Sequence, residues 1–353
     1  MKLLGISDTY LPADLMKREL AVLEDLGVDV EVRHWGHKTL IDLQEDNLKI
    51  ETGGPDAVPL PDAITRNLDG VGIVVVQFAP VSKSFIEKAK DLKLIGVMRA
   101  GAENIAVDFA TQRGISVMNT PGRNARAVAE CTMGLILAEI RNIARSHAKL
   151  KSKVWTRSFP NSDAIPELNE KTVGLVGYGA VAQLVCGYLQ AFGSNVIAFD
   201  PYFTGDPAPA RLVSLEELLS RSDVVSIHAR LTEQSYHLIG EKELAMMKPT
   251  AVLINTARSG LVDEQALIEA LRTRRITGAA VDVFDTEPLP PDHPFIELDN
   301  VTITAHLAGS TKDAFKNSVR LMTGHIRNAI NGAEDIPVIN GVRPTFDAGL
   351  RLG

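Results

Sequence analysis

KTVGLVGYGAVAQLVCGYLQAFGSNVIAFD, residues 171–200, is the stretch that decides the fold of this chain. It runs from a short apolar segment through the glycine turn G-x-G-x-x-A, Gly177 to Ala182, into an amphipathic segment and a second apolar segment that ends at Asp200. The first glycine permits a tight turn, Gly179 leaves room for a diphosphate, and Ala182 is small enough for a helix to pack closely on a strand. Strand, turn, helix, strand and acid in this order predict one βαβ nucleotide-binding unit.

The same unit indicates which nucleotide it binds. The N–H groups at the start of its helix, at Ala180 and Val181, can hold phosphate at the positive end of the helix dipole. Asp200 follows Gly177 by 23 positions (200 − 177), and its carboxylate can bind both ribose hydroxyls of NAD. The 2′-phosphate of NADP would be repelled by roughly 4 kcal/mol per unit charge at about 4 Å and an effective dielectric near 20. Because residues 201–203 supply no cation, we predict NAD rather than NADP.

Length, charge and cysteine usage exclude several classes of protein. A chain of 353 residues exceeds one ordinary domain, so two domains with separate cores are expected. The net charge of −7 is spread along the chain without a Lys/Arg-rich run, which argues against a nucleic-acid partner. The sequence has neither a signal-peptide core nor a run of 18 apolar residues, so a cytoplasmic protein without a membrane partner is expected. Cys131 and Cys186 lie on apolar helical faces without a C-x-x-C motif, which indicates core packing rather than a disulfide or a metal site.

The rest of the chain alternates between β-branched apolar runs and amphipathic segments, which is typical of parallel sheets flanked by helices. We predict an α/β fold of two domains: residues 1–121 with about 312–353, and residues 122–311. A long helix at 125–149 should link the domains or pack on a partner subunit. Residues 37–60 are polar and contain Gly and Pro, so a surface excursion is expected there. Strands are predicted at 3–6, 28–35, 73–78, 94–98, 115–119, 173–176, 195–199, 224–228, 251–257, 278–284 and 301–306, and further helices at 15–26, 107–113, 241–248, 263–272 and 311–331.

Three polar side chains follow strands of the second domain, where ligands of parallel sheets bind. Arg258 follows one strand, Glu287 follows the next, and His306 ends the last. A guanidinium beside a nicotinamide cofactor can bind a substrate carboxylate and polarise the neighbouring carbonyl. An imidazole can give that carbonyl its proton as hydride arrives, and a carboxylate can orient the imidazole. The set therefore suits hydride transfer at a carbonyl beside a carboxylate.

Each of the three residues also has a purely structural interpretation. Arg258 can pair with Asp263 or Glu264 at the start of the next helix. Glu287 can be a turn residue before a proline, and His306 can be a histidine of the core. Together, at three strand ends, the three residues favour the catalytic interpretation. His228 also ends a strand, and there we prefer the structural interpretation.

Six segments of the chain resemble the D-isomer-specific 2-hydroxyacid dehydrogenase family and together span most of its length. They are NTPGRNARAVAE at 119–130, VGLVGYGAVA at 173–182, DVVSIHARLT at 223–232, NTARSGLVDE at 255–264, AAVDVFDTEPLP at 279–290 and AHLAGST at 305–311. The resemblance implies two Rossmann-like domains, the first a flavodoxin-like substrate domain, with the active site in the cleft between them. It also implies a homodimer held by the long helix after the NTPG segment.

The resemblance also implies roles for single residues. Arg258, Glu287 and His306 match the family's catalytic Arg, Glu and His. Asp282 matches an acid that holds the nicotinamide carboxamide, and Gly101 with Ala102 matches a loop whose N–H groups bind the substrate carboxylate. The expected cofactor contacts are Gly177, Gly179, Ala180, Val181, Ala182, Asp200, Thr256, Ala257, Arg258, Asp282, His306 and Ala308, and the expected substrate contacts are Arg99, Gly101, Ala102 and Arg258.

The chain departs from the family pattern at a few positions. The loop at 99–104, RAGAEN, is shorter than the family's common loop and resembles a subgroup with R-G-G-P there. Ala305 and Arg230 stand where proline is usual, and Ser259 where glycine is usual, and none of these removes a catalytic group. Arg123 and Arg99 can bind a second anionic group such as a phosphate, or they can be solvated surface arginines.

We predict an NAD-dependent oxidoreductase of class EC 1.1.1.- that interconverts a D-2-hydroxy acid and its 2-keto acid. Phosphoglycerate, sugar-acid, glyoxylate and lactate-type substrates stay open, and the two extra arginines favour a phosphorylated or sugar-derived acid such as 3-phosphoglycerate. The alternative is an NAD-responsive, corepressor-like scaffold that binds partner proteins, against which the absence of motif-rich tails argues. Feedback inhibition by an amino acid is not expected, because no regulatory domain follows residue 353.

Overall fold

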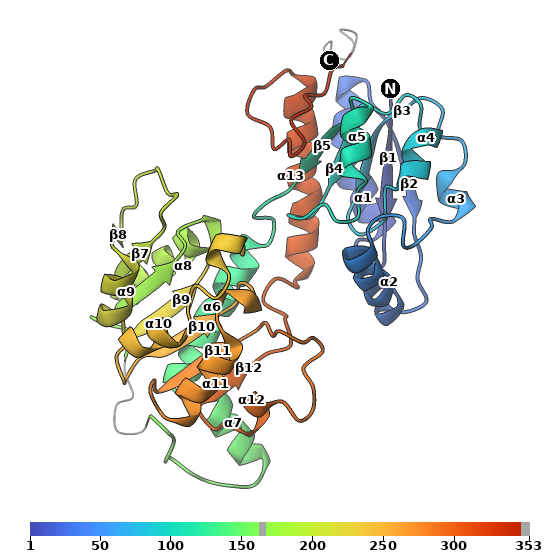
Figure 1. The fold of residues 1–353 in the computed structure, drawn as a ribbon. Helices are drawn as coiled ribbons and strands as arrows, with labels where there is room; N and C mark the ends of the chain where they lie inside the picture. The colour runs from blue at the N-terminus through green and yellow to red at the C-terminus, as the bar shows by residue number, and fades with distance from the viewer. Residues whose placement is uncertain (162–166, 347–353) are drawn as a thin grey trace. The chain divides into compact units, whose positions relative to one another are not determined.

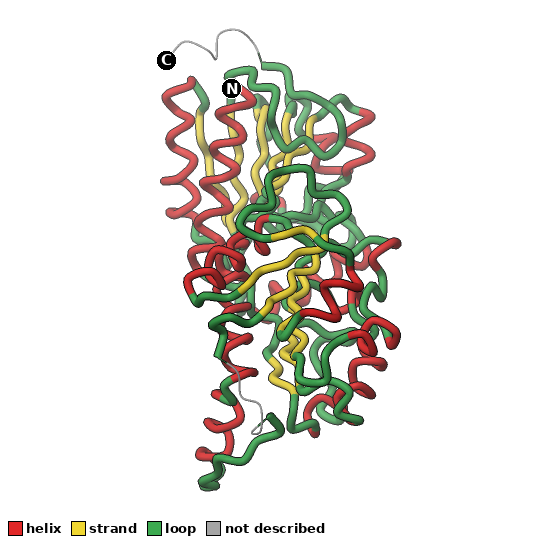
Figure 2. The backbone as a smooth tube through the Cα atoms, turned by 90° about the vertical axis from the view of Figure 1, so that its left-hand side faces the viewer, coloured by secondary structure: helices red, strands yellow, loops and turns green. Residues whose placement is uncertain are grey.

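The computed structural model describes residues 1–161 and 167–346, which divide into two compact units (Figure 1). Unit 1 comprises Met1–Asn124 and Thr311–Gly353, and unit 2 comprises Ala125–Ser310. Each unit is one parallel sheet flanked by helices, as expected from the alternating sequence pattern; Figure 2 shows the strands in yellow and the helices in red. The predicted α/β fold class is confirmed.

Unit 1 has a five-stranded sheet in the order β2-β1-β3-β4-β5. All its strand pairs are parallel, so the carboxyl ends of the five strands lie along one edge. The strands are β1 (Lys2–Ser7), β2 (Asp29–His34), β3 (Val71–Val76), β4 (Leu94–Val97) and β5 (Ser116–Asn119). The helices are α1 (Ala13–Leu20), the 3-10 helix η1 (Ala21–Leu26), α2 (Leu40–Gly53), α3 (Asp62–Thr65), α4 (Lys83–Lys88), α5 (Val107–Gln112) and α13 (Lys312–Ile330).

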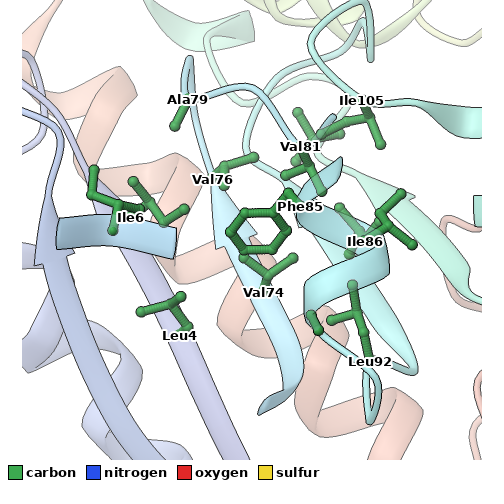
Figure 3. Packing of buried hydrophobic residues seen from close by; sticks show 14 of the residues in the cluster. Leu4, Ile6, Val74, Val76, Ala79, Val81, Phe85, Ile86, Leu92 and Ile105 are labelled. Carbon is green, nitrogen blue, oxygen red and sulfur yellow. The ribbon is translucent and has the colours of Figure 1, made fainter. Parts of the chain in front are cut away.

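The sheet of unit 1 is buried on both faces, which explains its continuous apolar strands. All six residues of β3 are buried. On one face Phe85 and Ile86 of α4 pack near Val74 and Val76 of β3 (Figure 3). On the other face Val75 belongs to a second cluster that includes side chains of α1 and α13. The segment after α13 returns to this unit, because Ile339 N–H donates to Val117 O at 2.9 Å.

The polar stretch 37–60, expected to be a surface excursion, contains the helix α2, which was not predicted from the sequence. Thr39 and Asp42 form a capping box at the start of α2, and each side chain accepts a hydrogen bond from the backbone N–H of the other. Only Leu43 and Ile50 of this helix are buried, so its amphipathic pattern is weak. Ile41 and Leu48 are more than half exposed. The capping box was the available sequence signal for this helix.

Unit 2 has a seven-stranded sheet in the order β12-β11-β10-β9-β6-β7-β8. The strand order reverses between β6 (Thr172–Val176) and β9 (Val224–Ile227), the position at which such sheets bind dinucleotides. The other strands are β7 (Asn195–Phe199), β8 (Arg211–Leu212), β10 (Val252–Asn255), β11 (Gly278–Val281) and β12 (Val301–Ile303). The helices are α6 (Ala125–Ile140), α7 (Ile143–Lys151), α8 (Ala180–Ala191), α9 (Leu215–Arg221), α10 (Glu241–Met246), α11 (Glu264–Arg272) and α12 (Pro294–Glu297), with 3-10 helices η2 (Glu233–Ser235) and η3 (Ser259–Leu261).

The single helix predicted at 125–149 is wrong, because the structure has two helices there, α6 and α7. The break lies at Asn142, whose backbone is left-handed with φ of 57°. Its side-chain amide donates to Asn161 Oδ1 at 2.6 Å, and Asn161 Nδ2 donates to Ile140 O at 3.0 Å. These contacts with a distant segment supply a hydrogen bond to a backbone carbonyl at the end of α6. The apolar pattern of residues 125–149 could not predict them.

The other differences between the predicted and the observed elements involve only a few residues each. The predicted strands at 251–257, 278–284 and 301–306 end two to three residues early, where the chain turns to present polar side chains. Strand β8 was not predicted. Both cysteines are free: Cys186 is buried in the core of unit 2, and Cys131 packs against the same cluster.

Candidate active site

The glycine turn of unit 2 has the geometry of a diphosphate site. Gly177 has φ of 88°, and an added Cβ would lie 2.5 Å from the Ala229 nitrogen, so no other residue fits. Gly179 caps α8, and an added Cβ there would meet nothing within 4 Å. That open space lies at a helix start, where N–H groups bind phosphate. Ala182 is fully buried against the sheet, as its small size requires.

Asp200 lies directly beside this turn. Its Oδ2 accepts a hydrogen bond from the Tyr178 N–H at 2.8 Å, and its Oδ1 accepts one from the Tyr202 N–H at 2.9 Å. Both oxygens keep further lone pairs, and the residue is partly exposed. The carboxylate is therefore fixed in orientation and remains able to accept hydrogen bonds from a ribose.

His306 and Glu287 form a hydrogen-bonded pair. His306 Nδ1 lies 2.7 Å from Glu287 Oε2, and the other carboxylate oxygen accepts from the Phe284 N–H at 3.0 Å. The His306 side chain is 49% exposed, so its interpretation as a core histidine is wrong. Glu287 orients an imidazole and is more than a turn residue. Since Nδ1 faces the carboxylate, Nε2 is the nitrogen left to exchange a proton with a ligand.

Asp282 stabilises the turn that contains His306. His306 has φ of 50°, an unfavourable value for a residue with a side chain. Asp282 is fully buried, and its carboxylate accepts hydrogen bonds from Thr304 Oγ1 at 2.5 Å, Leu307 N at 3.0 Å and Ala308 N at 2.9 Å. These three bonds offset the strain and fix the imidazole. The predicted contact of Asp282 with the nicotinamide carboxamide stays a prediction.

Arg258 lies on a turn that is held in a similar way by Asn255. The Asn255 side chain accepts from the Ala257 N–H and donates to the Arg258 carbonyl, both at 3.0 Å. Arg258 is exposed and forms no ion pair with any described residue. Its alternative partners are engaged elsewhere, because Asp263 caps α11 and Glu264 lies 3.1 Å from His293 Nε2. Arg258 Nη1 donates to the Ala257 carbonyl at 2.7 Å, and the guanidinium keeps further N–H groups and an unmatched charge for an anionic ligand.

Thr256, a predicted cofactor contact, is buried. Its hydroxyl lies 2.8 Å from that of Thr132 on α6, in a buried position. Ala308 is also buried, and its N–H group is taken by Asp282. Three supporting residues, Thr132, Asn255 and Thr304, were not predicted from the sequence. Of these, only Asn255 had a local signal, as an asparagine at a strand end.

The predicted substrate residues of unit 1 follow β4. Arg99 donates to Asn47 Oδ1 at 2.8 Å, pairs with Glu51, and lies 3.8 Å from Glu103 Oε2. Its charge is therefore already matched by two carboxylates. The N–H groups of Gly101 and Ala102 donate no hydrogen bond to any described residue, and the Glu103 carboxylate lies against Gly101. Their predicted contact with the substrate carboxylate stays a prediction.

His228 has the structural role preferred for it. Its Nε2 lies 2.9 Å from Ser226 Oγ, and the protein around the ring lowers the pKa of His228 to about 4 by disfavouring the charged form. Over the described ranges, no group of His, Cys, Asp and Glu side chains could hold a metal ion. No helix in this part of the chain has both the length and the apolar character needed to span a membrane.

Comparison with known proteins agrees with this geometry. Residues 133–308 match the family model described as D-isomer specific 2-hydroxyacid dehydrogenase, NAD binding domain. The chain is 36% identical over 291 residues to a glyoxylate reductase of Thermofilum pendens, with 81% of this chain and 86% of that protein covered. It is 39% identical over 307 residues to a D-3-phosphoglycerate dehydrogenase of Methanocaldococcus jannaschii, with 84% of this chain and 58% of that protein covered.

A solved structure shows the same fold. It is the NAD-complexed form of a D-isomer specific 2-hydroxyacid dehydrogenase of Lactobacillus delbrueckii, with a TM-score of 0.78 at 23% identity and coverage of 96% of this chain and all of that one. The chain spans 51 to 58% of the length of the phosphoglycerate dehydrogenases that it matches. Residues 133–308 are an NAD-binding domain, and the chain belongs to the D-isomer specific 2-hydroxyacid dehydrogenase family.

Proposed function

We propose that this chain is an NAD-dependent oxidoreductase that interconverts a D-2-hydroxy acid and its 2-keto acid. The observation that carries the proposal is the 2.7 Å pair of His306 and Glu287, in the same unit as an open glycine turn and an unpaired Arg258. An oriented imidazole, a free guanidinium and a dinucleotide site are the groups that hydride transfer at a 2-keto acid requires.

The proton is moved by His306. In the oxidation direction Nε2 takes the proton of the 2-hydroxyl group, the C–H bond at C2 breaks, and a C=O double bond forms. The nicotinamide of bound NAD supplies the acceptor for the hydride. In the reverse direction the imidazole returns the proton to the carbonyl oxygen. Glu287 holds Nδ1 throughout, so that Nε2 faces the reacting oxygen and the positive imidazolium is stabilised.

Arg258 binds the substrate carboxylate, and the substrate contacts of Gly101 and Ala102 stay a prediction. The planar guanidinium of Arg258 binds a carboxylate through two parallel hydrogen bonds and polarises the adjacent carbonyl. A direct substrate contact of Arg99 would require it to release Glu51 or Glu103. We therefore assign Arg99 to shaping the loop that contains Gly101.

The cofactor is NAD rather than NADP. The Asp200 carboxylate lies beside the Tyr178 N–H of the glycine turn, where the ribose of a dinucleotide on α8 would lie. Ala180, Val181 and the turn glycines hold the diphosphate. Thr256, Ala257, Asp282 and Ala308 shape the walls of the nicotinamide site.

The assembly and the compartment are also part of the proposal. We propose a homodimer and a cytoplasmic location, supported by the family. Two half-exposed apolar side chains of α7, Ile143 and Leu150, and the largely exposed Trp155 after it are consistent with a covered surface.

A substrate panel tests the function. The purified full chain would be assayed with NAD or NADP against D- and L-forms of lactate, glycerate, 3-phosphoglycerate and 2-hydroxyglutarate, and in reverse against glyoxylate and hydroxypyruvate. We expect turnover of D-acids with NAD, and a value of kcat/KM above about 10⁴ M⁻¹s⁻¹ for the best substrate. No turnover of any acid, together with an NAD-dependent change in captured partner proteins, would favour the scaffold alternative.

A further inference from the structure

Helix α6 contacts the sheet of unit 2 through two polar side chains that lie on one face of the helix. Thr132 and Glu139 are seven positions apart (139 − 132), which is about two helical turns. Both are buried among apolar side chains of the same helix and of the sheet. The Thr132 hydroxyl lies 2.8 Å from that of Thr256, and the Thr302 hydroxyl donates to Glu139 Oε2 at 2.7 Å. The helix is therefore hydrogen-bonded to the segment after β10 and to β12.

A glycine of the sheet leaves space for the Glu139 carboxylate. Gly278 is the first residue of β11, and an added Cβ there would collide with Glu139 Oε1. Because Gly278 has no side chain, the carboxylate reaches past β11 to the next strand. Its partner there, Thr302, is the middle residue of β12. The sequence of β11 is thus compatible with a hydrogen bond between α6 and β12.

The pairing of β12 within the sheet is short, so its position depends on other contacts. Among the described strands it pairs only with β11, and it is the edge strand of the sheet and has three residues, Val301–Ile303. The segment after it contains His306, four positions beyond Thr302 (306 − 302). Between them Thr304 donates to the Asp282 carboxylate at 2.5 Å. A displacement of β12 would therefore move the imidazole and weaken a bond that stabilises its turn.

Arg145 of α7 completes the network. Its Nη2 lies 2.5 Å from Glu139 Oε1, and its Nε donates to the Asp299 carbonyl at 2.7 Å, two positions before β12. Each oxygen of the Glu139 carboxylate therefore has a partner. Burial raises the pKa of Glu139, whereas the Arg145 guanidinium and the Thr302 hydroxyl lower it. Strand β12 is thus held at its middle residue and just before its start.

The alternative role of this network is to stabilise unit 2 without any effect on the site. A buried ion pair is weak evidence for stability, because the cost of removing two charges from water offsets their attraction. The apolar side chains around Glu139 already pack α6 against the sheet. An apolar side chain cannot supply a directed hydrogen bond to one hydroxyl of one strand. The network therefore fits orientation of β12 better than added stability.

We propose that Glu139, through Thr302, is a positioning residue for His306. The Glu139 carboxylate holds β12 in place, so that the turn after this strand presents the His306 ring to Glu287. Glu139 and Thr302 are buried and act only through that turn. This inference rests on the proposed dehydrogenase function, because it concerns the geometry of the imidazole that the reaction uses.

Substitutions at Thr302 separate the hydrogen bond from the shape of the side chain. Thr302→Val keeps the branched shape and removes the hydroxyl, whereas Thr302→Ser keeps the hydroxyl. We expect kcat of Thr302→Val to fall about tenfold, the lower end of the effect of losing a hydrogen bond to a charged group, and Thr302→Ser to regain most of the loss. The KM for NAD should stay within about twofold of wild type, because the glycine turn is unchanged.

Thr277→Val is the matched control. The Thr277 hydroxyl also makes a hydrogen bond in unit 2, to the Pro249 carbonyl at 3.0 Å. It precedes β11, so it lies at the opposite edge of the parallel sheet from His306. Each kcat is referred to the fraction of full-length chains that bind NAD in a titration. A preparation that is only partly folded therefore still gives a valid value.

A spectroscopic measurement tests the position of the imidazole without turnover. The nitrogen NMR signals of the His306 ring are recorded in protein labelled at its histidine nitrogens, and they are identified by their absence in His306→Ala. Thr302→Val should move the Nδ1 signal, because a weakened bond to Glu287 changes the surroundings of that nitrogen. Thr302→Ser and Thr277→Val should leave the signal near its wild-type position.

A double variant tests whether Glu139 acts through Thr302. Glu139→Met keeps the length of the side chain and removes the acceptor, so it breaks the same bond from the other side. If both residues act through this one bond, the double variant should be about as slow as the slower single variant. Losses of kcat that multiply would show independent effects and would overturn the assignment of Glu139.

The outcomes separate this inference from the proposed function. A kcat of Thr302→Val equal to that of Thr277→Val, or an unmoved His306 ring signal, would overturn the positioning role and leave the dehydrogenase function intact. A wild-type chain that oxidises no D-2-hydroxy acid would overturn the dehydrogenase function itself. The ring signal of Thr302→Val would still decide whether β12 positions the imidazole.

Discussion

The pair of Glu287 and His306 gives the sharpest test of the proposed mechanism. Glu287→Gln keeps a side-chain oxygen that can accept a hydrogen bond from His306 Nδ1 but removes the negative charge. Glu287→Ala removes both the charge and the acceptor. The two variants therefore separate orientation of the imidazole from stabilisation of the imidazolium, which is positive only while it holds the substrate proton.

The size of the effect follows from the geometry. A hydrogen bond between charged groups contributes about 1.5–3 kcal/mol. The side chains of His306 and Glu287 are 49% and 35% exposed, so water screens their charges and the lower part of that range applies to loss of the charge alone. We expect kcat to fall about tenfold in Glu287→Gln and about 100-fold in Glu287→Ala.

The assay is kcat for oxidation of the best D-2-hydroxy acid, with substrate carrying hydrogen or deuterium at C2. The isotope effect shows whether hydride transfer limits the rate, so that a slower chemical step is not hidden by product release. Glu217→Gln is the control, since Glu217 is a carboxylate of the same unit that pairs with Arg211 and Arg221 at the surface. Wild-type turnover in both Glu287 variants, with a full isotope effect, would refute the orienting role.

Three further changes test other parts of the structure. His306→Ala should lower kcat by about 10² to 10⁴ with little change in NAD affinity measured by titration, and unchanged turnover would remove His306 from proton transfer. Asp200→Ala should narrow the preference for NAD over NADP by about one to two orders of magnitude in kcat/KM, whereas an unaltered preference would discard the ribose contact. Asp8→Asn should stabilise the fold above pH 6, because the folded state raises the pKa of Asp8 from 3.8 to about 6 and stability is lost as pH rises through that interval. The gain has an upper limit of about 3 kcal/mol in the free energy of unfolding, measured by denaturant titration at pH 4 and pH 7.5, and an equal gain at both values would contradict the assignment.

The features that the sequence predicted correctly are encoded locally. The turn from Gly177 to Ala182, the acid at Asp200 and the positions of Arg258, Glu287 and His306 after strands follow from apolar periodicity and from residues a few positions apart. A parallel sheet places such strand ends along one edge, so local patterns are enough to bring the residues to one region of a unit. The joint pattern was therefore more informative than any single residue.

The missed features depend on contacts between distant segments. The break at Asn142 is fixed by Asn161, and the strained backbone of His306 by Asp282, which lies 24 positions earlier (306 − 282). Helix α2 buries only two residues, yet its Asn47 and Glu51 hold Arg99. Periodicity of one segment contains no information about such partners, so the paired state of Arg99 and the unpaired state of Arg123 required the structure.

Each unit contains an energetically unfavourable feature: a left-handed residue with a side chain in unit 2, and buried polar atoms without partners in unit 1. In unit 2 the left-handed backbone of His306 is offset by three hydrogen bonds to Asp282, so the cost is met within the protein. In unit 1 the unpaired guanidinium of Arg123 and the free oxygen of Asp8 have no such compensation among the described residues. Strain or unpaired charge that the fold itself does not offset is expected where a ligand supplies the missing interactions. The catalytic imidazole is therefore preorganised within unit 2 before any substrate binds.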